Sequence, residues 1–378
     1  MNDSTVSGHE AGAGSHVAGG AQRFVVLDGL RGVAAFAVIL DHVPGGALGD
    51  LLPGRYLAVD FFFVLSGLVL THAYGRRLEQ GWSPLTFMKA RLIRLYPMYL
   101  LGLMIGLALS VMGLLRGWVG PTWSDVLTTA ALGLLFLPAP PMPAFGGGSL
   151  YPFNGPAWSL FFELIANLIY ALIARFLSWR MLGAILAVAS VAVVYTLNRH
   201  AGMGGPGWLW EHIDAGFARV MFDFFAGVAI HRLRLMRKIP ALPWWLALAG
   251  FLAVIAVPAP GEWRVVYDSA AALILMPALV ALSAGSRVTG VVARICSTIG
   301  LLSYGVYVIH VPMFAALGVG AAALHVQLGE GPWLALLVAV LAAVGAAVAH
   351  VVYDTPLRGW LSARARKPNV RNIPGERG

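Results

Sequence analysis

Long apolar runs separated by short polar segments extend along almost the whole chain. Ten of these runs are long enough to cross about 30 Å of hydrocarbon as helices, which rise about 1.5 Å per residue. They lie near residues 25–43, 56–74, 96–115, 156–174, 181–197, 214–231, 241–258, 265–283, 297–318 and 332–351. The pattern predicts an all-α fold, a polytopic integral membrane helical bundle of about ten transmembrane helices.

A further apolar run at 126–141 is short and ends in prolines, so it is either a re-entrant segment or a crossing. If it does not cross and the N-terminus is inside, twenty of the 26 Lys and Arg residues fall in inner loops and tails. Four then lie outside and two within spans. Because Lys and Arg concentrate on the cytoplasmic side of membrane proteins, this arrangement is favoured and predicts that both termini are cytoplasmic. A crossing would instead place the basic segment "HRLRLMRK" and the C-terminal tail outside.

The chain divides into one membrane domain and two tails. Residues 1–22 are small and polar, with too little apolar surface to offset the entropy of ordering, and are expected to form a disordered cytoplasmic tail. Residues 23–360 are expected to form the transmembrane domain, and 361–378 a basic cytoplasmic tail.

Composition supports the membrane class and excludes several functions. Hydrophobic residues make up 59% of the chain and charged residues 11%, whereas soluble domains carry about 25% charged residues. The net charge is +9, and the basic residues lie in short loops between spans. This distribution is typical of an orientation signal in a membrane protein, so no nucleic acid partner is expected. Cys296 is the single cysteine, and no Cys or His cluster has metal-ligand spacing, so neither a disulfide nor a bound metal is expected.

The first run, "LDGLRGVAAFAVILDHV", holds four ionisable residues: Asp28, Arg31, Asp41 and His42. A charge in hydrocarbon costs roughly 2.5 to 3.5 kcal/mol, so these residues need partners or a function. Arg31 and His42 are eleven residues apart, which returns them to one helix face about 16 Å apart along the axis. Asp28, three residues before Arg31, is its expected ion partner. The alternative is a structural ion pair and an interfacial histidine without a special role.

Other polar residues lie at membrane depth in several spans. They are Asp60 in 56–74, Trp158, Ser159 and Glu163 in 156–174, and Ser303, Tyr304, Tyr307 and His310 in 297–318. Ser303, Tyr307 and His310 fall along one helical stripe because they are spaced by four and three residues. Such residues often serve as hydrogen-bonding contacts between helices. Two histidines and several carboxylates in different spans nevertheless indicate a shared polar cavity.

Arg91 and Arg94 in "RLIRLYP" lie at the expected inner face, with Arg76, Arg77 and Lys89 nearby. An inner basic cluster is usually an orientation signal or a contact with anionic lipids. The alternative is a phosphate site for a donor that contains a nucleotide, since the arginine fork matches phosphate oxygens.

Six motifs in order resemble the membrane acyltransferase-3 family, bacterial proteins that O-acylate sugars. The motifs are "LDGLRGVAAFAVILDH", "FFFVLSGLVL", "RLIRLYP", "NGPAWSLFFE", "SYGVYVIHVP" and "VVYDTPLR". They span roughly residues 23 to 360. The resemblance implies a bacterial inner-membrane O-acyltransferase that moves an acyl group, commonly acetyl, from acyl-CoA to a hydroxyl of a carbohydrate or glycolipid. Family positions matched here are Arg31, His42, Arg91, Arg94, Trp158, Ser159, Glu163, Tyr304 and His310.

The resemblance and the chemistry of acyl transfer together assign expected roles. Acyl transfer to a hydroxyl requires a base that titrates near neutral pH, and imidazole does so. His42 is therefore the expected general base, or an acyl carrier, with Asp60 or Glu163 as the carboxylate that orients its ring.

The remaining candidates are expected to bind the substrates. Arg91 and Arg94 would hold the coenzyme A phosphates, and Arg31, paired with Asp28, would contact the slender pantetheine arm. Trp158 would stack on the acceptor sugar. Ser159, Tyr304 and His310 are also expected in the substrate site.

Two other functional classes remain open at this point. A secondary transporter or an exporter of lipid-linked sugars would also bury charges, although no inverted repeat is evident in the sequence. A non-catalytic scaffold explains the polar spans least well.

Overall fold

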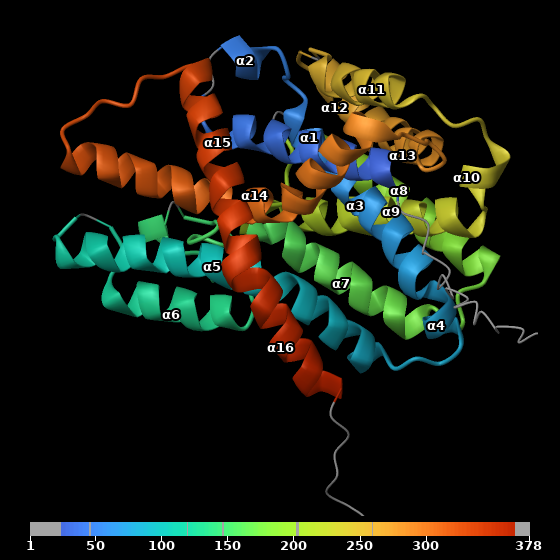
Figure 1. Ribbon diagram of the computed structural model, residues 1–378, viewed down its shortest axis with the longest axis horizontal. Helices are drawn as coiled ribbons and strands as arrows, with labels where there is room; N and C mark the ends of the chain where they lie inside the picture. The colour runs from blue at the N-terminus through green and yellow to red at the C-terminus, as the bar shows by residue number, and fades with distance from the viewer. Residues whose placement is uncertain are drawn as a thin grey trace, which may run out of the picture.

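The computed structural model describes residues 24–366 apart from 45–46, 119, 146, 202–203 and 259, and its elements are helices (Figure 1). It confirms the all-α membrane bundle. The expected tail at 1–22 lies outside the described residues. The last helix continues to Arg366, into the segment expected as the basic tail, and residues 367–378 lie outside the described residues.

Loops of varied length join the helices. In chain order they are α1 (Val25–His42), α2 (Ala47–Asp50), α3 (Ala58–Leu70), α4 (Arg76–Glu79), α5 (Pro84–Leu115), α6 (Trp123–Leu134), α7 (Ala157–Ile173), α8 (Trp179–Arg199), α9 (Ile213–Arg232), α10 (Leu235–Lys238), α11 (Trp244–Ala256), α12 (Trp263–Ala270), α13 (Met276–Ser283), α14 (Gly290–Ala323), α15 (Pro332–Ala349) and α16 (Thr355–Arg366). Three π-helical turns, η2 (Thr71–Gly75), η5 (Ala271–Leu275) and η6 (His350–Asp354), make continuous rods of α3–α4, α12–α13 and α15–α16.

Six continuous helices are long and apolar enough to cross a membrane within the described part of the chain. They are Arg55–Glu79, Pro84–Leu115, Trp179–Arg199, Trp263–Ser283, Gly290–Ala323 and Pro332–Ala365, and α7 and α11 are shorter apolar helices. The two other expected spans correspond to α1 and α9, which carry three and four charged residues. Most residues of both helices are buried. These two helices therefore lie inside the bundle, where neighbouring helices can compensate their charges.

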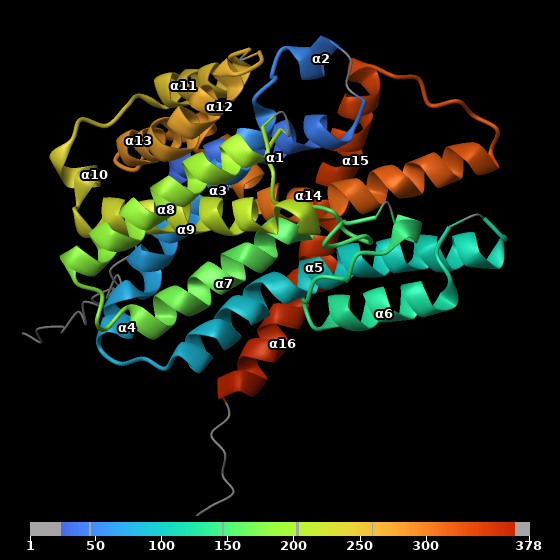
Figure 2. The same cartoon turned by 180° about the vertical axis from the view of Figure 1, so that it is seen from behind.

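The short run expected between residues 126 and 141 forms α6, which lies beside α5 in both ribbon views (Figures 1 and 2). A capping box begins α6: the Thr122 hydroxyl accepts from the Asp125 amide at 3.3 Å, and the Asp125 carboxylate accepts from the Thr122 amide at 2.8 Å. With 12 residues α6 is about 18 Å long, too short to span 30 Å of hydrocarbon by itself.

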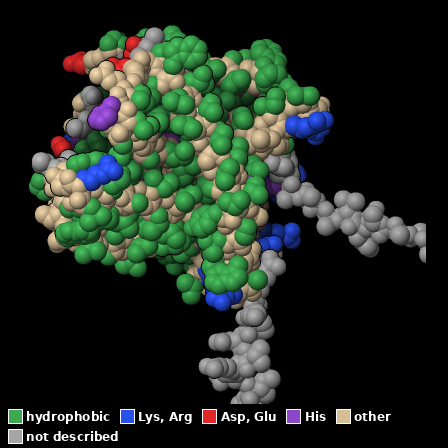
Figure 3. All heavy atoms as spheres, turned by 60° about the vertical axis from the view of Figure 1, so that its left-hand side comes forward, with side chains coloured by type: hydrophobic (Ala, Val, Ile, Leu, Met, Phe, Trp, Pro, Cys, Tyr) green, Lys and Arg blue, Asp and Glu red, His purple; other side chains and the backbone are tan. Residues whose placement is uncertain are grey.

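The outside of the bundle matches a lipid environment. Figure 3 shows a face covered by hydrophobic side chains, with charged side chains near its edges. Large apolar residues are exposed along the membrane helices, among them Val188 and Val191 on α8 and Val351 and Val352 on the α15–α16 rod. Contiguous apolar surface of this kind is stable in lipid and would promote association in water.

The α14 helix contains Pro312 in its interior. Proline has no backbone N–H, so it cannot donate to the carbonyl of Val308 one turn earlier, and the helix loses one hydrogen bond there. The missing bond lies beside the buried His310.

A close crossing of α3 and α9 fixes the centre of the bundle. A Cβ atom on Gly67 would overlap the backbone carbonyl oxygen of Phe224, and one on Gly227 would overlap that of Val64. The two backbones therefore touch, as they do at small-residue interfaces of membrane helices.

We predict that Gly67→Ala lowers the free energy of unfolding by about 1 to 3 kcal/mol, because the added methyl must push α3 away from α9. Gly183→Ala on α8 is the matched control, since nothing lies within 4 Å of its new Cβ atom. Thermal unfolding of both variants in detergent measures the difference. Equal melting temperatures would contradict the close crossing.

Candidate active site

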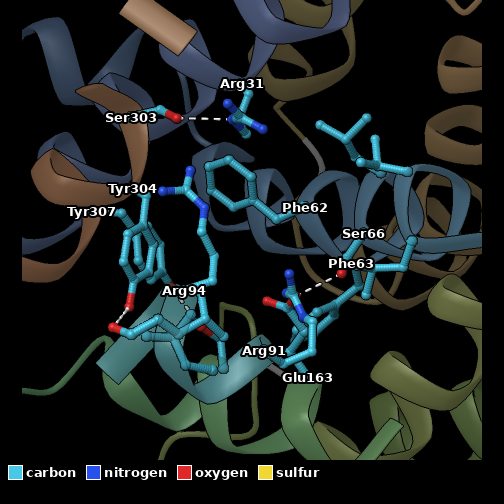
Figure 4. Close-up of a pocket in the computed structure, with 16 residues that line it drawn as sticks. Arg31, Phe62, Phe63, Ser66, Arg91, Arg94, Glu163, Ser303, Tyr304 and Tyr307 are labelled. Carbon is cyan, nitrogen blue, oxygen red and sulfur yellow. Dashed lines mark hydrogen bonds and ion pairs between the residues drawn. The ribbon is translucent and has the colours of Figure 1, made fainter. Parts of the chain in front are cut away.

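A cavity of about 150 Å³ lies where α1, α3, α5, α7 and α14 meet (Figure 4). Its polar lining consists of Arg31, Ser66, Arg91, Arg94, Ser159, Glu163, Ser303, Tyr304 and Tyr307. Apolar side chains, including Phe62, Phe63 and Leu95, complete it. Most of these polar residues were singled out from four separate segments of the sequence, and the fold brings them together. Among the described residues, no group of three or more His, Cys, Asp or Glu side chains could hold a metal ion.

Arg31 of α1 is bound on two sides. Its Nε atom donates to the Ser303 hydroxyl at 2.9 Å, and a terminal nitrogen donates to the Gly300 carbonyl at 2.6 Å, both on α14. The same guanidinium lies 3.1 Å from the carboxylate of Asp28, which confirms the expected local ion pair. Oxygen atoms therefore compensate the charge of Arg31 inside the bundle, while its side chain still lines the cavity.

Arg91 and Glu163 form an ion pair across α5 and α7. The guanidinium donates to the carboxylate at 2.8 Å, and the Ser66 hydroxyl donates to the same oxygen at 2.6 Å. Both charged side chains are largely buried. Arg91 therefore reaches the cavity already paired, with less charge available for a ligand than the sequence analysis expected.

Arg94 reaches into the same cavity between Tyr304 and Phe62 (Figure 4). Within the described part of the chain its guanidinium forms no ion pair or hydrogen bond with protein groups. The Tyr304 hydroxyl donates to the carbonyl of Leu95. Arg94 is thus the cation of this cavity that is most available to an anionic ligand.

Phe62, Ser159 and Tyr307 form a partition at another side of the cavity. The Tyr307 and Ser159 hydroxyls lie 2.6 Å apart, and the Ser159 hydroxyl also donates to the Pro156 carbonyl at 3.1 Å. The ring of Phe62 meets that of Tyr307 edge to face at 5.4 Å between centroids. Tyr307 lines the cavity on one side, and on the other its ring lies 6.2 Å from that of His310.

His42 and His310 form a pair beyond this partition and do not line the cavity. His310 is fully buried, and its Nδ1 atom lies 2.8 Å from the Tyr307 carbonyl oxygen. A carbonyl only accepts hydrogen bonds, so this Nδ1 carries the proton and Nε2 is left as an acceptor.

The same reasoning assigns the protons of His42. Its Nδ1 atom lies 2.9 Å from the Val38 carbonyl oxygen and 3.3 Å from the acceptor Nε2 of His310. Nδ1 of His42 therefore carries a proton in the neutral ring, and Nε2 has a free lone pair. The exposed side chain of His42 presents that lone pair at the end of α1.

The expectation that Asp60 or Glu163 orients the ring of His42 is wrong in this structure. Asp60 is fully buried and accepts two hydrogen bonds from Arg219, at 2.9 and 2.8 Å. Glu163 is bound to Arg91. A buried carboxylate gains far more from a guanidinium than from a neutral imidazole, so each acid has the stronger partner.

Trp158 is placed differently from the expectation as well. It is only 6% exposed, the Arg219 guanidinium lies 5.8 Å from its ring, and Phe63 and Phe162 meet it edge to face. Its ring does not line the cavity and has no face open for stacking on a sugar. Asp60 and Arg219 thus act on the site indirectly, since they hold Trp158 and with it the neighbouring Ser159.

The sequence analysis did not assign site roles to Phe62, Ser66, Arg219 and Tyr307. Ser66 and Arg219 carry the signal that identified Arg31, a polar side chain inside an apolar run. Tyr307 lies on the predicted stripe with His310. Phe62 has no comparable signal, because it is one of three consecutive phenylalanines.

Comparisons with known proteins give the family of this chain. Residues 24–352 match the acyltransferase domain family. The chain is also similar to "Protein 2 in picA locus" of Rhizobium radiobacter, with 40% identity over 184 residues, which cover 46% of this chain and 94% of that protein. No solved structure matches the chain. The family match covers most of the chain, including the cavity and the histidine pair, and the chain therefore belongs to the acyltransferase-3 family of membrane acyltransferases.

Proposed function

We propose that the protein transfers an acyl group, acetyl in the simplest case, from acyl-CoA to a hydroxyl of a carbohydrate or glycolipid, with His42 as general base. The observation that carries this proposal is the histidine pair, whose hydrogen bonds leave a lone pair on Nε2 of His42. The family supplies the reaction class. The cation-lined cavity supplies a place for the donor.

The donor enters the cavity with its pantetheine arm. The lining combines cations with apolar side chains, so the arm lies along the apolar part and the donor phosphates lie near Arg94. Because α1 is unbroken, Arg31 and His42 lie about 16 Å apart along it, and an extended arm bridges this distance.

The thioester reaches the histidine pair only if the partition opens. The hydrogen bond between Ser159 and Tyr307 supports a closed partition, because it joins two residues of that partition. Opening exchanges this bond for contacts with the donor and joins the cavity to His42.

With the partition open, the reaction is a direct transfer of the acyl group from the thioester to the acceptor hydroxyl. The acceptor hydroxyl attacks the thioester carbonyl while Nε2 of His42 takes its proton. A C–O bond forms, the C–S bond breaks, and the proton passes from His42 to the thiolate that leaves. Nε2 of His310 accepts the hydrogen bond from Nδ1 of His42 and stabilises the imidazolium that forms for a moment.

The basic loops support an inner-membrane orientation with both termini cytoplasmic, and in that orientation the cavity would receive acyl-CoA from the cytoplasm. The exposed His42 then faces an acceptor on the other side of the membrane.

We predict that His42→Ala lowers acyl transfer by about 10² to 10⁴-fold, because the base is lost while the fold is kept. The assay is transfer of labelled acetyl from acetyl-CoA to membrane glycans, together with release of free thiol by protein in detergent. Asp41→Asn is the control, since Asp41 adjoins His42 but pairs with Arg55. Transfer by His42→Ala at the parental rate would contradict the assignment of the base. Failure of the parental protein to release thiol in the presence of acceptor would favour a transporter.

We predict that Arg94→Ala raises the KM for acyl-CoA about tenfold or more with little change in kcat, since it removes charge-assisted hydrogen bonds to the donor phosphates. Arg77→Ala, which removes an exposed charge that does not line the cavity, should leave the KM unchanged. Steady-state kinetics over a range of acyl-CoA concentrations separate the two parameters. A fall in kcat alone in Arg94→Ala would rule out the phosphate-binding role.

We predict that Tyr307→Phe and Ser159→Ala both raise acceptor-independent hydrolysis of acetyl-CoA, by about fivefold. Each substitution removes one partner of the same hydrogen bond, worth about 1 kcal/mol, and so weakens the partition. Thiol release without acceptor measures the effect. No response in either variant would show that this bond does not control the passage.

A further inference from the structure

A second, wider cavity of about 540 Å³ lies at one end of the bundle, among the α3–α4 rod, α8, α9 and α10. We call it the basic cleft. Its cationic and titratable lining residues are His72, Arg76, His231, Arg232, Arg234 and Arg237. It shares no lining residue with the donor cavity, so the reaction proposed above does not use it.

The charge of the basic cleft is poorly compensated. Four arginines and one acid, Glu79, line it, which leaves an excess of three positive charges. In the part of the chain that the structure describes, Arg76, Arg234 and Arg237 form no ion pair or side-chain hydrogen bond, and all three are exposed. Like charges gathered around a concave surface repel one another, and a bound anion relieves that repulsion.

The backbone brings two of these arginines to the cleft at a cost. Arg234 adopts a left-handed conformation with φ of 54°, which is uncommon for a residue with a long side chain. This residue joins the end of α9 to α10, and α10 carries Arg237. Backbone strain of this kind is typically kept where it serves a site.

Arg232 is held in place before any ligand binds. Its guanidinium donates to the Leu177 carbonyl and lies 5.2 Å from the ring of Trp179. His72 and His231, with ring centroids 5.5 Å apart, form another part of the lining. A planar guanidinium fixed at a concave surface is well suited to the oxygens of a phosphate.

Trp179 places the basic cleft at the level of lipid headgroups. It is half exposed and is the first residue of α8, one of the candidate membrane spans. Tryptophan concentrates at the membrane interface, where its ring meets the headgroups. Met236 adds a second apolar side chain to the cleft.

From these features we infer that the basic cleft binds a phosphate group, supplied by the headgroup of an anionic phospholipid in the adjoining leaflet. The excess positive charge attracts the anion, and the arginines donate to the phosphate oxygens. Trp179 and Met236 contact the glycerol region. The nucleotide phosphates of coenzyme A share this chemistry, but they adjoin a ribose and an adenine and not the glycerol and acyl chains found at headgroup level beside Trp179, so the lipid fits better.

The test is binding of phosphatidylglycerol to the purified full-length protein in detergent, measured by native mass spectrometry with phosphatidylcholine for comparison. The double variant Arg76→Gln/Arg237→Gln removes two charges from the cleft. The control Arg77→Gln/Lys238→Gln removes two charges from the adjacent sequence positions, which are also exposed but do not line the cleft.

We predict that the cleft variant weakens phosphatidylglycerol binding about tenfold or more, through loss of charge-assisted hydrogen bonds, while the control changes it less than about twofold. Equal weakening in both variants would overturn the inference, because it would mean general surface attraction. Equal binding of phosphatidylcholine by the parental protein would also overturn it.

Binding of 3′,5′-ADP in the same variants distinguishes the source of the phosphate. If the cleft variant loses 3′,5′-ADP and keeps phosphatidylglycerol, the phosphate site stands and the lipid assignment is overturned. These measurements require no turnover, so failure of the proposed acyl transfer and failure of this inference are separate results.

Discussion

The contact between α1 and α14 is the constraint on which the site depends. At one end of this contact Arg31 donates to Ser303 and to the Gly300 carbonyl, and at the other His42 meets His310. Neither Arg31 nor His310 would be stable in lipid alone, because a polar group in hydrocarbon must find a partner within the protein. The pairing of the helices therefore stabilises the bundle and also sets the distance between the donor cavity and the imidazoles.

The contact between α3 and α9, at the centre of the bundle, also pairs buried polar groups across two helices. Asp60 and Arg219 compensate each other across helices that approach as closely as glycine permits. The pair is remote from the proposed chemistry, yet it holds Trp158, which precedes Ser159 of the partition. Removing Arg219 would leave the buried carboxylate of Asp60 without its cation, which typically costs several kcal/mol.

Much of the fold followed from the sequence, because long apolar runs admit few structures other than membrane helices. Local spacing also identified the ion pair of Asp28 with Arg31 and the α14 stripe that carries Tyr307 and His310. Spacing could not identify partners far apart in the chain. Asp60 lies 159 residues from Arg219, and nothing local indicates that this pairing excludes an interaction with an imidazole. The polar positions of the site were thus predictable, whereas their partners depended on the packing of helices.

The proline inside α14 gives the two sides of the site unequal stiffness. Phe62 and Ser66 belong to α3, which α9 holds rigidly at the glycine crossing. His310 and Tyr307 belong to α14, which lacks the backbone hydrogen bond from Pro312 to the carbonyl of Val308, a residue between the two. Bending should therefore occur in α14. The wall of the cavity formed by α3 stays fixed, and the wall formed by α14 moves. For the proposed transfer, a compliant wall of this kind would let the partition open while the α3 side keeps its packing.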